Sequence, residues 1–238
     1  MNQIKRLLTL TIITLMASLL IHADDRDWAG INRYAEANAK LPAPAKGQHR
    51  VVFLGNSITE GWFNTHPNFF NDNNYVGRGI SGQTSSQFLG RFREDVIKLN
   101  PEVVVINAGT NDCAENTGPF NLEVTFGNIV SMVELARAND IKVILTSVLP
   151  AAEFGWNRNV TDAPDRINSL NAKIKAYAES HKIPYVDYYS AMVSDRDGAQ
   201  NPAYTGDGVH PNAAGYDVME SLIVPAINKT IRRNRKTK

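Results

Sequence analysis

The chain has 238 residues, of which 43% are hydrophobic and 21% are charged. This length suits one large domain or two small ones, and the composition supports a packed core rather than a disordered tail. The formal net charge is only +1, which argues against a nucleic-acid-binding protein, because such proteins normally carry a clear basic excess. Cys113 is the single cysteine, so the chain can form no intramolecular disulfide and no cysteine-based zinc site.

The N-terminus, residues 1–23, has the organisation of a secretory signal peptide. Lys5 and Arg6 precede an apolar run over residues 7–21, and Ala23 supplies the small residue of a cleavage site. The run has about 15 residues, short of the roughly 20 that a membrane-spanning helix needs. We therefore expect cleavage after Ala23, a secreted or periplasmic protein, and no stable membrane anchoring after cleavage.

The rest of the chain, residues 24–238, is expected to form a single domain without repeats. A short helix is predicted over residues 27–40, and several short apolar stretches follow. Most of them are apolar at consecutive positions, as in strands that are buried on both faces of a parallel sheet. In chain order, the predicted strands are residues 51–54, a weaker stretch around 75–76, 103–106, 141–145 and 185–188.

Helical segments separate these strands. Apolar residues recur with the helical period over residues 88–99 and 167–177. Thr84 with Gln87, and Asp162 just ahead of Pro164, have the pattern of helix starts. Strands that alternate with helices predict right-handed βαβ units in an α/β fold, with helices on both faces of a parallel sheet.

The last segment, Lys229 to Lys238, carries six positive charges. We interpret it as the solvated end of the last helix. The alternative is an electrostatic handle for acidic polymers or for a membrane surface.

Ligands of open parallel sheets bind beyond the carboxyl ends of the strands, so the loops that follow the strands are the place to look for function. Four such loops contain unusual residues. Taken alone, each is an ordinary turn or helix cap. Together they predict a site at one edge of the sheet: residues 55–61 (Gly-Asn-Ser-Ile-Thr-Glu-Gly), 79–84 (Gly-Ile-Ser-Gly-Gln-Thr), 109–112 (Gly-Thr-Asn-Asp) and 207–212 (Asp-Gly-Val-His-Pro-Asn).

One serine, one histidine and one aspartate in these loops form a nucleophile, base and orienting set. Ser57 follows a glycine turn, where its hydroxyl is exposed at a helix N-terminus. His210 is the histidine that we expect to follow a strand directly. Asp207 lies three residues before His210, so a single turn can place its carboxylate against the imidazole.

In type, order and spacing, the four loops resemble the SGNH hydrolases, also called the GDSL esterase/lipase superfamily. The four residues that name the superfamily correspond to Ser57, Gly82, Asn111 and His210. The later segments are similar to the branch with platelet-activating-factor acetylhydrolase subunits and bacterial carbohydrate acetylesterases. The resemblance implies a flavodoxin-like, three-layer α/β/α fold around a five-stranded parallel sheet, and a serine esterase without metal or organic cofactor.

The resemblance also implies a role for each residue. Ser57 is the nucleophile, His210 the general base and Asp207 its orienting partner. The oxyanion hole is formed by the backbone N–H groups of Ser57 and Gly82 and by the side-chain amide of Asn111. Position 56 departs from the family, because Asn56 stands where an aspartate is usual. Asn56 removes a negative charge beside the nucleophile, and we expect activity to survive this change.

The substrate is less defined by the sequence. Trp62, Phe154, Trp156 and Tyr204 are candidates for a wall that stacks on a sugar or holds an acyl chain, or they belong to the core. No long hydrophobic lid is evident, which favours short-chain esters, above all O-acetyl esters, on a small molecule or polysaccharide. The alternatives are a lysophospholipase or acyl-thioesterase of the same superfamily and, more remotely, an inactive binding protein. We interpret Cys113 as a buried, inert thiol.

Overall fold

The computed structural model of the protein describes residues 27–195 and 197–232. The predicted signal peptide, residues 1–23, and the last residues of the basic tail, 233–238, lie outside the described residues. Within the part of the chain that is described, no helix is both long enough and apolar enough to cross a membrane.

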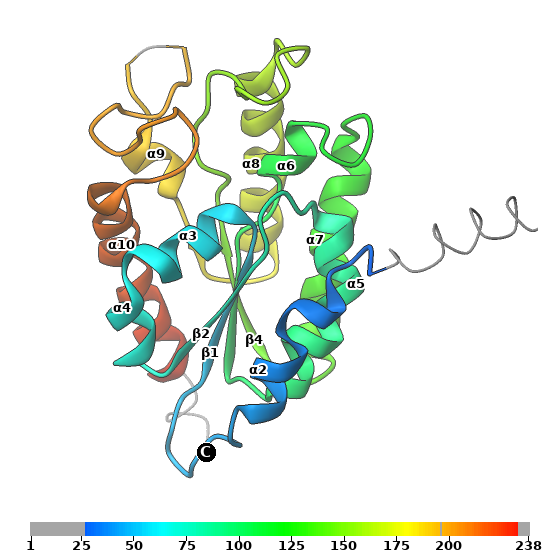
Figure 1. The fold of residues 1–238 in the computed structure, drawn as a ribbon, viewed down its shortest axis with the longest axis vertical. Coiled ribbons are helices and arrows are strands. Elements are labelled where there is room, and N and C mark those ends of the chain that lie inside the picture. Colours follow the sequence, from blue (N-terminus) through cyan, green and yellow to red (C-terminus); the bar gives the residue numbers. More distant parts are fainter. Residues whose placement is uncertain (1–26, 196, 233–238) are drawn as a thin grey trace, which may run out of the picture.

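The centre of the molecule is a parallel sheet of five strands in the order β2-β1-β3-β4-β5 (Figure 1). Every residue of β1 and β3, two of the three inner strands, is buried, which explains their unbroken apolar sequence. The pairing is in register, with Gly55 opposite Gly79 and Leu54 opposite Ile106. The strands are β1 (Val51–Gly55), β2 (Tyr75–Gly79), β3 (Val103–Ile106), β4 (Lys142–Thr146) and β5 (Tyr185–Val186).

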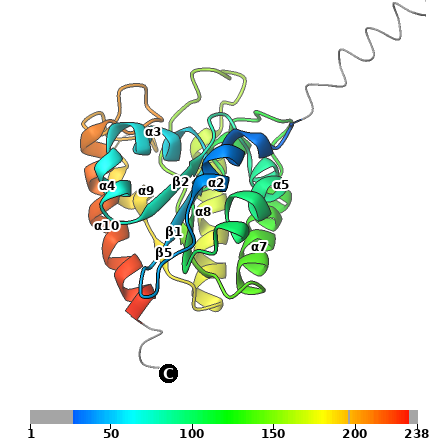
Figure 2. The same ribbon diagram turned by 60° about the horizontal axis from the view of Figure 1, so that its bottom comes forward.

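Helices cover both faces of this sheet, so the predicted three-layer α/β/α fold is confirmed (Figures 1 and 2). Alternate residues of β1 serve the two layers: Val52 and Leu54 belong to one core cluster, and Val51 and Phe53 to the other. The first cluster includes residues of α5 (Ser85–Asp95), α7 (Leu122–Arg137) and α8 (Ala163–Ser180). The second includes residues of α3 (Ser57–Thr65), α4 (Pro67–Asn71), α9 (Tyr188–Met192) and α10 (Ala213–Arg232).

The ends of several elements differ from the sequence prediction. The helix predicted over residues 27–40 is divided into the 3-10 helix η1 (Ile31–Tyr34) and α2 (Ala35–Lys40). The strand predicted over residues 185–188 is wrong beyond Val186, because the Asp187 side chain caps α9 by accepting a hydrogen bond from Ser190 N at 3.0 Å. Tyr188 therefore lies in a helix.

Other local predictions are confirmed. Thr84 and Gln87 form a capping box at the start of α5. Asp162 stands just before α8, which has proline in its first turn. The helix predicted over residues 88–99 is confirmed as α5 followed by the 3-10 helix η2 (Ile97–Leu99). Lys229 lies inside the last turn of α10, so the described part of the basic tail is the end of a helix.

The pair Gly55 and Gly79 brings α3 close to the end of β2. A Cβ atom at Gly79 would lie 2.3 Å from the backbone nitrogen of Glu60 and 2.6 Å from the carbonyl oxygen of Asn56. Both atoms belong to the backbone at the start of α3, so neither can move away without shifting that helix. The absence of a side chain at Gly79 thus fixes how closely α3 approaches the sheet edge.

We expect Gly79→Ala to lower the free energy of unfolding by about 1–3 kcal/mol or more, as overpacking of a tight site does. Gly127→Ala is the matched control, because Gly127 lies within α7 and a Cβ atom there would meet nothing within 4 Å. It should be neutral or stabilise by about 0.5–1 kcal/mol. Urea unfolding measures both; equal midpoints for the two variants would contradict the tight contact.

Candidate active site

Ser57 lies at the first position of α3, directly beyond the carboxyl end of β1. Asn56 makes the turn between the two elements. Its buried side chain accepts a hydrogen bond from Ile58 N at 2.9 Å and caps the helix. The Asn56 side chain thus caps α3 with an oxygen atom that an aspartate would also offer. Ser57, the next residue, is partly exposed at this end of the sheet.

The structure brings Ser57, His210 and Asp207 into one line of contacts. The Ser57 Oγ atom lies 2.8 Å from His210 Nε2, and His210 Nδ1 lies 2.6 Å from Asp207 Oδ2. Since a carboxylate faces Nδ1, this nitrogen carries the proton, and Nε2 accepts a hydrogen bond from the Ser57 hydroxyl. A histidine in this tautomer can take the serine proton, which is the arrangement that general-base catalysis needs.

The Asp207 carboxylate is well supplied with donors. Its Oδ1 atom accepts hydrogen bonds from the backbone nitrogens of Val209 at 2.9 Å and His210 at 2.8 Å. Burial alone would raise the pKa of Asp207, but these donors and the His210 ring outweigh it and lower the pKa to about 2. Asp207 is therefore ionised throughout the pH range in which an esterase works.

The prediction that His210 directly follows a strand is wrong. After β5 ends at Val186, the chain forms α9 and then a long loop that reaches His210. Thr205, which the sequence analysis did not single out, folds this loop back: its hydroxyl donates to His210 O at 2.8 Å and accepts from Gly208 N at 3.0 Å. A threonine two residues before an aspartate in a glycine-rich stretch is the pattern from which this turn could have been predicted.

Gly82 and Asn111, the two predicted oxyanion residues outside α3, lie in adjacent loops. Gly82 has a φ of 78°, a conformation that favours glycine. Asn111, in the short helix α6 (Thr110–Cys113), is buried, and its Nδ2 atom donates to Gln83 O at 2.9 Å. One amide hydrogen thus fastens Asn111 to the residue after Gly82, and the role of Asn111 in an oxyanion hole stays a prediction.

Asp112, the neighbour of Asn111, connects α6 to the start of α5. Its carboxylate accepts hydrogen bonds from the Ser85 backbone nitrogen at 3.0 Å and from the Ser85 hydroxyl at 2.5 Å. Burial raises the pKa of Asp112, and the Ser85 donors act against this rise. The loops that carry Gly82 and Asn111 are therefore fixed to each other at two points.

The four aromatic residues predicted to bind substrate have different environments. Trp62 is only 2% exposed, belongs to the second core cluster and donates to Glu220 Oε1 at 2.9 Å. Phe154 is completely buried. Both therefore fill the core, which corrects the predicted wall. Tyr204 is partly buried and packs against the second core cluster.

Trp156 is the aromatic candidate that the structure places at the site. Its side chain is 48% exposed, and its ring centroid lies 6.1 Å from that of His210. Phe154 supports it from beneath, with ring centroids 5.4 Å apart. Asn116, which sequence reasoning missed, accepts a hydrogen bond from Trp156 Nε1 at 2.8 Å and donates to Gly82 O at 3.0 Å. Asn116 thereby connects the exposed indole to the loop that carries Gly82.

A separate group, His66, Asp217 and Glu220, has ligand atoms within 4.8 Å of one another. Glu220 Oε1 already binds His66 Nδ1 at 2.7 Å and the Trp62 indole nitrogen at 2.9 Å, so this group joins α10 to the end of α3. Ser57 is at the other end of α3. The expectation of a reaction without metal or organic cofactor stays a prediction.

Cys113 is buried, and burial raises the pKa of its thiol far above the usual range. The thiolate that a nucleophile or a metal ligand requires is thus disfavoured.

Comparison with known proteins decides the family. Residues 53–218 match the GDSL-like Lipase/Acylhydrolase family. The chain belongs to this family. The prediction of a carboxylic ester hydrolase of the SGNH superfamily is therefore confirmed at the level of the family.

Solved structures of two Bacteroides proteins are very similar to this chain. A protein of Bacteroides fragilis assigned as an acylhydrolase is 68% identical, with a TM-score of 0.86 over 87% of this chain and 99% of that chain. A GDSL-like lipase from Bacteroides thetaiotaomicron is 65% identical, with a TM-score of 0.83 over 84% of this chain and 98% of that chain.

A curated relative is the acetylxylan esterase of Xylanibacter ruminicola, which is 24% identical over 79% of this chain. The chain spans 45% of that enzyme and 15% of the multidomain esterase of Ruminococcus flavefaciens, another relative. The substrates of the longer proteins are thus not transferred to this chain by similarity alone.

We expect Asn111→Ala to lower kcat by about 100-fold or more with little change in KM, because a preorganised donor to the oxyanion acts mainly in the transition state. Steady-state kinetics on p-nitrophenyl acetate measures this. A raised KM with an unchanged kcat would mean that Asn111 binds the ground state of the substrate instead.

We expect Asp207→Asn to lower kcat by roughly 1,000-fold or more, because the carboxylate sets the tautomer and orientation of His210.

The Asp207→Asn variant also tests the lowered pKa of Asp207. A depressed pKa stabilises the folded state above the unfolded value of about 3.9, and this stabilisation is lost as the pH falls towards about 2. Urea midpoints of wild type and variant should differ near pH 6 and converge in acid; a constant difference would contradict the shift.

Proposed function

We propose that the protein is a secreted or periplasmic serine esterase that removes short acyl groups, above all O-acetyl groups, from carbohydrates. The observation that carries the proposal is the continuous contact from the Ser57 hydroxyl through the His210 ring to the Asp207 carboxylate, with 2.8 Å and 2.6 Å between the bonding atoms. The site residues and the family are those of an acyl hydrolase.

Acylation begins at the Ser57 hydroxyl. His210 Nε2 removes the hydroxyl proton as Ser57 Oγ attacks the ester carbonyl carbon, and the carbonyl oxygen becomes an oxyanion. His210 then donates the proton to the leaving alcohol, the bond between the carbonyl carbon and that oxygen breaks, and an acyl-enzyme forms. Asp207, ionised at working pH, stabilises the imidazolium that exists between these two steps.

The oxyanion is bound by donors that are in place before the substrate arrives. The backbone N–H groups of Ser57 and Gly82 and the free amide hydrogen of Asn111 supply three hydrogen bonds. Such donors lower the barrier because they need no reorganisation when the charge develops. Water then attacks the acyl-enzyme, His210 takes its proton, and the acid is released as Ser57 regains its hydrogen.

Three features support a short acyl group on a carbohydrate. Trp156 offers an exposed indole face beside His210, and sugars stack on such faces. The curated relatives include a protein named as an acetylxylan esterase. The solved structure of an acetylxylan esterase from Geobacillus stearothermophilus has a similar fold, with a TM-score of 0.59 over 79% of this chain. The N-terminal pattern of residues 1–23 supports export, which gives access to polysaccharides outside the cytoplasm.

We expect Ser57→Ala to retain less than about one hundredth of wild-type kcat on p-nitrophenyl acetate while its urea midpoint stays close to that of wild type, because the nucleophile is lost and the core is untouched. Ser221→Ala is the matched control, since Ser221 is an exposed serine of α10 that lies outside the loops of the site. If Ser57→Ala keeps more than about a tenth of the activity, the nucleophile is assigned wrongly. An inactive wild type would favour a binding protein that kept the fold.

Substrate class is tested on two series. Among p-nitrophenyl esters, kcat/KM should be far higher for acetate than for octanoate; the reverse order would favour the lysophospholipase or thioesterase alternative. Acetate release should then be measured on acetylated xylan, pectin, chitin fragments and sialosides. The expected result is release from at least one of these, and none from the Ser57→Ala protein.

A further inference from the structure

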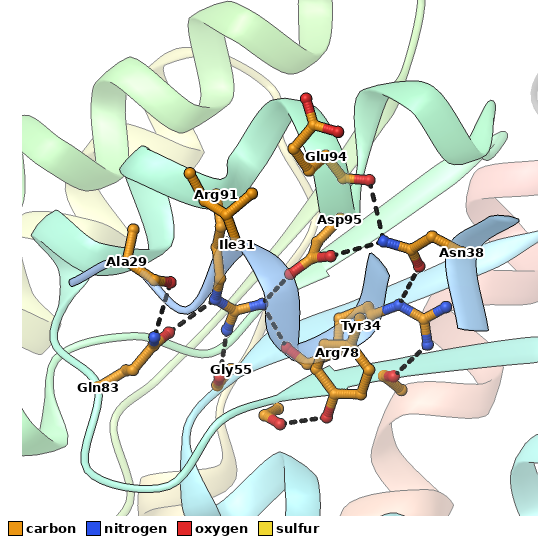
Figure 3. Close-up of polar contacts among 12 residues, drawn as sticks. Ala29, Ile31, Tyr34, Asn38, Gly55, Arg78, Gln83, Arg91, Glu94 and Asp95 are labelled. Carbon is orange, nitrogen blue, oxygen red and sulfur yellow. Dashed lines mark hydrogen bonds and ion pairs between the residues drawn. The ribbon is translucent and has the colours of Figure 1, made fainter. Parts of the chain in front are cut away.

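Arg91 is a completely buried arginine on α5 that lies beneath the carboxyl ends of β1 and β2 (Figure 3). An arginine is rarely buried so fully unless its charge is paired and its N–H groups are bonded. Arg91 meets both conditions. Its charge is paired with Asp95, one helical turn further on, at 2.9 Å.

The other N–H groups of Arg91 do not bind within α5. Nε donates to the Gln83 side-chain oxygen at 2.7 Å, Nη2 donates to Gly55 O at 2.9 Å, and Nη1 donates to Arg78 O at 3.0 Å. These acceptors belong to the end of β1, the end of β2 and the loop that follows β2. One planar guanidinium therefore connects three segments that meet at the edge of the sheet.

Two of these segments carry candidate oxyanion donors. Gly55 lies two residues before Ser57, and Gln83 directly follows Gly82. Gln83 also accepts, through its carbonyl oxygen, the hydrogen bond from the Asn111 amide at 2.9 Å. The two residues that Arg91 binds, Gly55 and Gln83, thus lie within two residues or one hydrogen bond of each of the three proposed donors, although Arg91 does not touch the reacting atoms.

The donors must reach one oxygen from separate pieces of chain. Ser57 N–H and Gly82 N–H lie on segments that are 25 residues apart in sequence, and hydrogen bonds to a common atom tolerate little variation in distance. We propose that Arg91 is a positioning residue of the oxyanion hole, which holds the β1 end and the Gly82–Gln83 loop at the separation that the tetrahedral intermediate requires. This role rests on the proposed function.

The surroundings of Arg91 favour a rigid clamp. Gln83 is held at its other end, since its Nε2 atom donates to Ala29 O at 2.8 Å. Asp95 also accepts a hydrogen bond from Asn38 at 2.8 Å, so residues 29–38 lie beside the Arg91–Asp95 pair (Figure 3). Residues 29–38 and α5 therefore lie around the guanidinium.

Arg91→Lys tests the role, because lysine keeps the charge but cannot reproduce the planar fork. Arg50→Lys is the matched control. Arg50 is also a buried arginine that donates to backbone carbonyls, at Leu99 and Pro42, but it precedes β1 at the opposite end of the sheet. Both variants should lower the melting temperature, and Arg91→Lys alone should lower kcat.

For p-nitrophenyl acetate, the expected loss in kcat is about 10- to 100-fold with KM within about twofold of wild type, since small misplacements of catalytic groups have effects of this size. Phenylboronic acid supplies a second measurement. Phenylboronic acid bonds to the serine oxygen as a tetrahedral anion. Its inhibition constant should therefore rise in Arg91→Lys by about the factor by which kcat falls, and it should stay unchanged in Arg50→Lys.

Gln83→Met is the second variant, which decides the matter if Arg91→Lys does not fold. It removes the acceptor for Arg91 Nε together with the hydrogen bond from Gln83 to Ala29 O, and it leaves the contacts of Arg91 to Gly55 and Arg78 intact. We expect a loss in kcat of about 3- to 10-fold. A kcat within about twofold of Arg50→Lys in every folded variant would overturn the positioning role while the esterase assignment stands. An inactive wild type would instead overturn the proposed function and this role with it.

Discussion

The in-register pairing of β1 with its two neighbours is the constraint on which the site depends. Gly55 pairs with Gly79, and Leu54 pairs with Ile106, so three loops leave the sheet at the same level. Neighbouring strands are about 5 Å apart, which places the starts of these loops within reach of one small substrate group. A slip of β1 by one residue would exchange the side chains that it gives to the two core layers, so the packing of the hydrophobic core and the position of the loops that follow the strands are fixed together.

This convergence brings many polar groups to a place with little water. Each unpaired polar group there would destabilise the fold, and several of these groups are paired by hydrogen bonds to one another. Asn111 binds Gln83, Asp112 binds Ser85, and Arg91 binds Gly55 and Gln83. The hydrogen bonds that satisfy the buried groups are the same bonds that orient the candidate oxyanion donors. Stability and preorganisation therefore have a common origin at this edge of the sheet.

The sequence predicts the features that local chemistry determines. Consecutive apolar residues indicate buried parallel strands, and the glycine turns with Ser57 and Asp207 indicate the site. Features that depend on tertiary packing cannot be predicted from the sequence in this way. Trp62 resembles a binding residue until its burial is known. Arg91, beside Arg93 in a helix, resembles a solvated surface charge, because the sequence does not show that α5 turns this position towards the strand ends. β5 ends early because Asp187 starts a helix.

The Gly82–Gln83 segment has supports of two kinds, on two sides. On the buried side, Arg91 holds the Gln83 side chain in contacts that are closed to solvent. On the exposed side, Asn116 holds Gly82 O and also the indole of Trp156, which contacts solvent. Changes at Trp156 can alter the surface offered to a substrate while the buried support keeps the donors in place. In this chain the contacts that hold the candidate donors are therefore separate from those that hold the exposed indole beside His210.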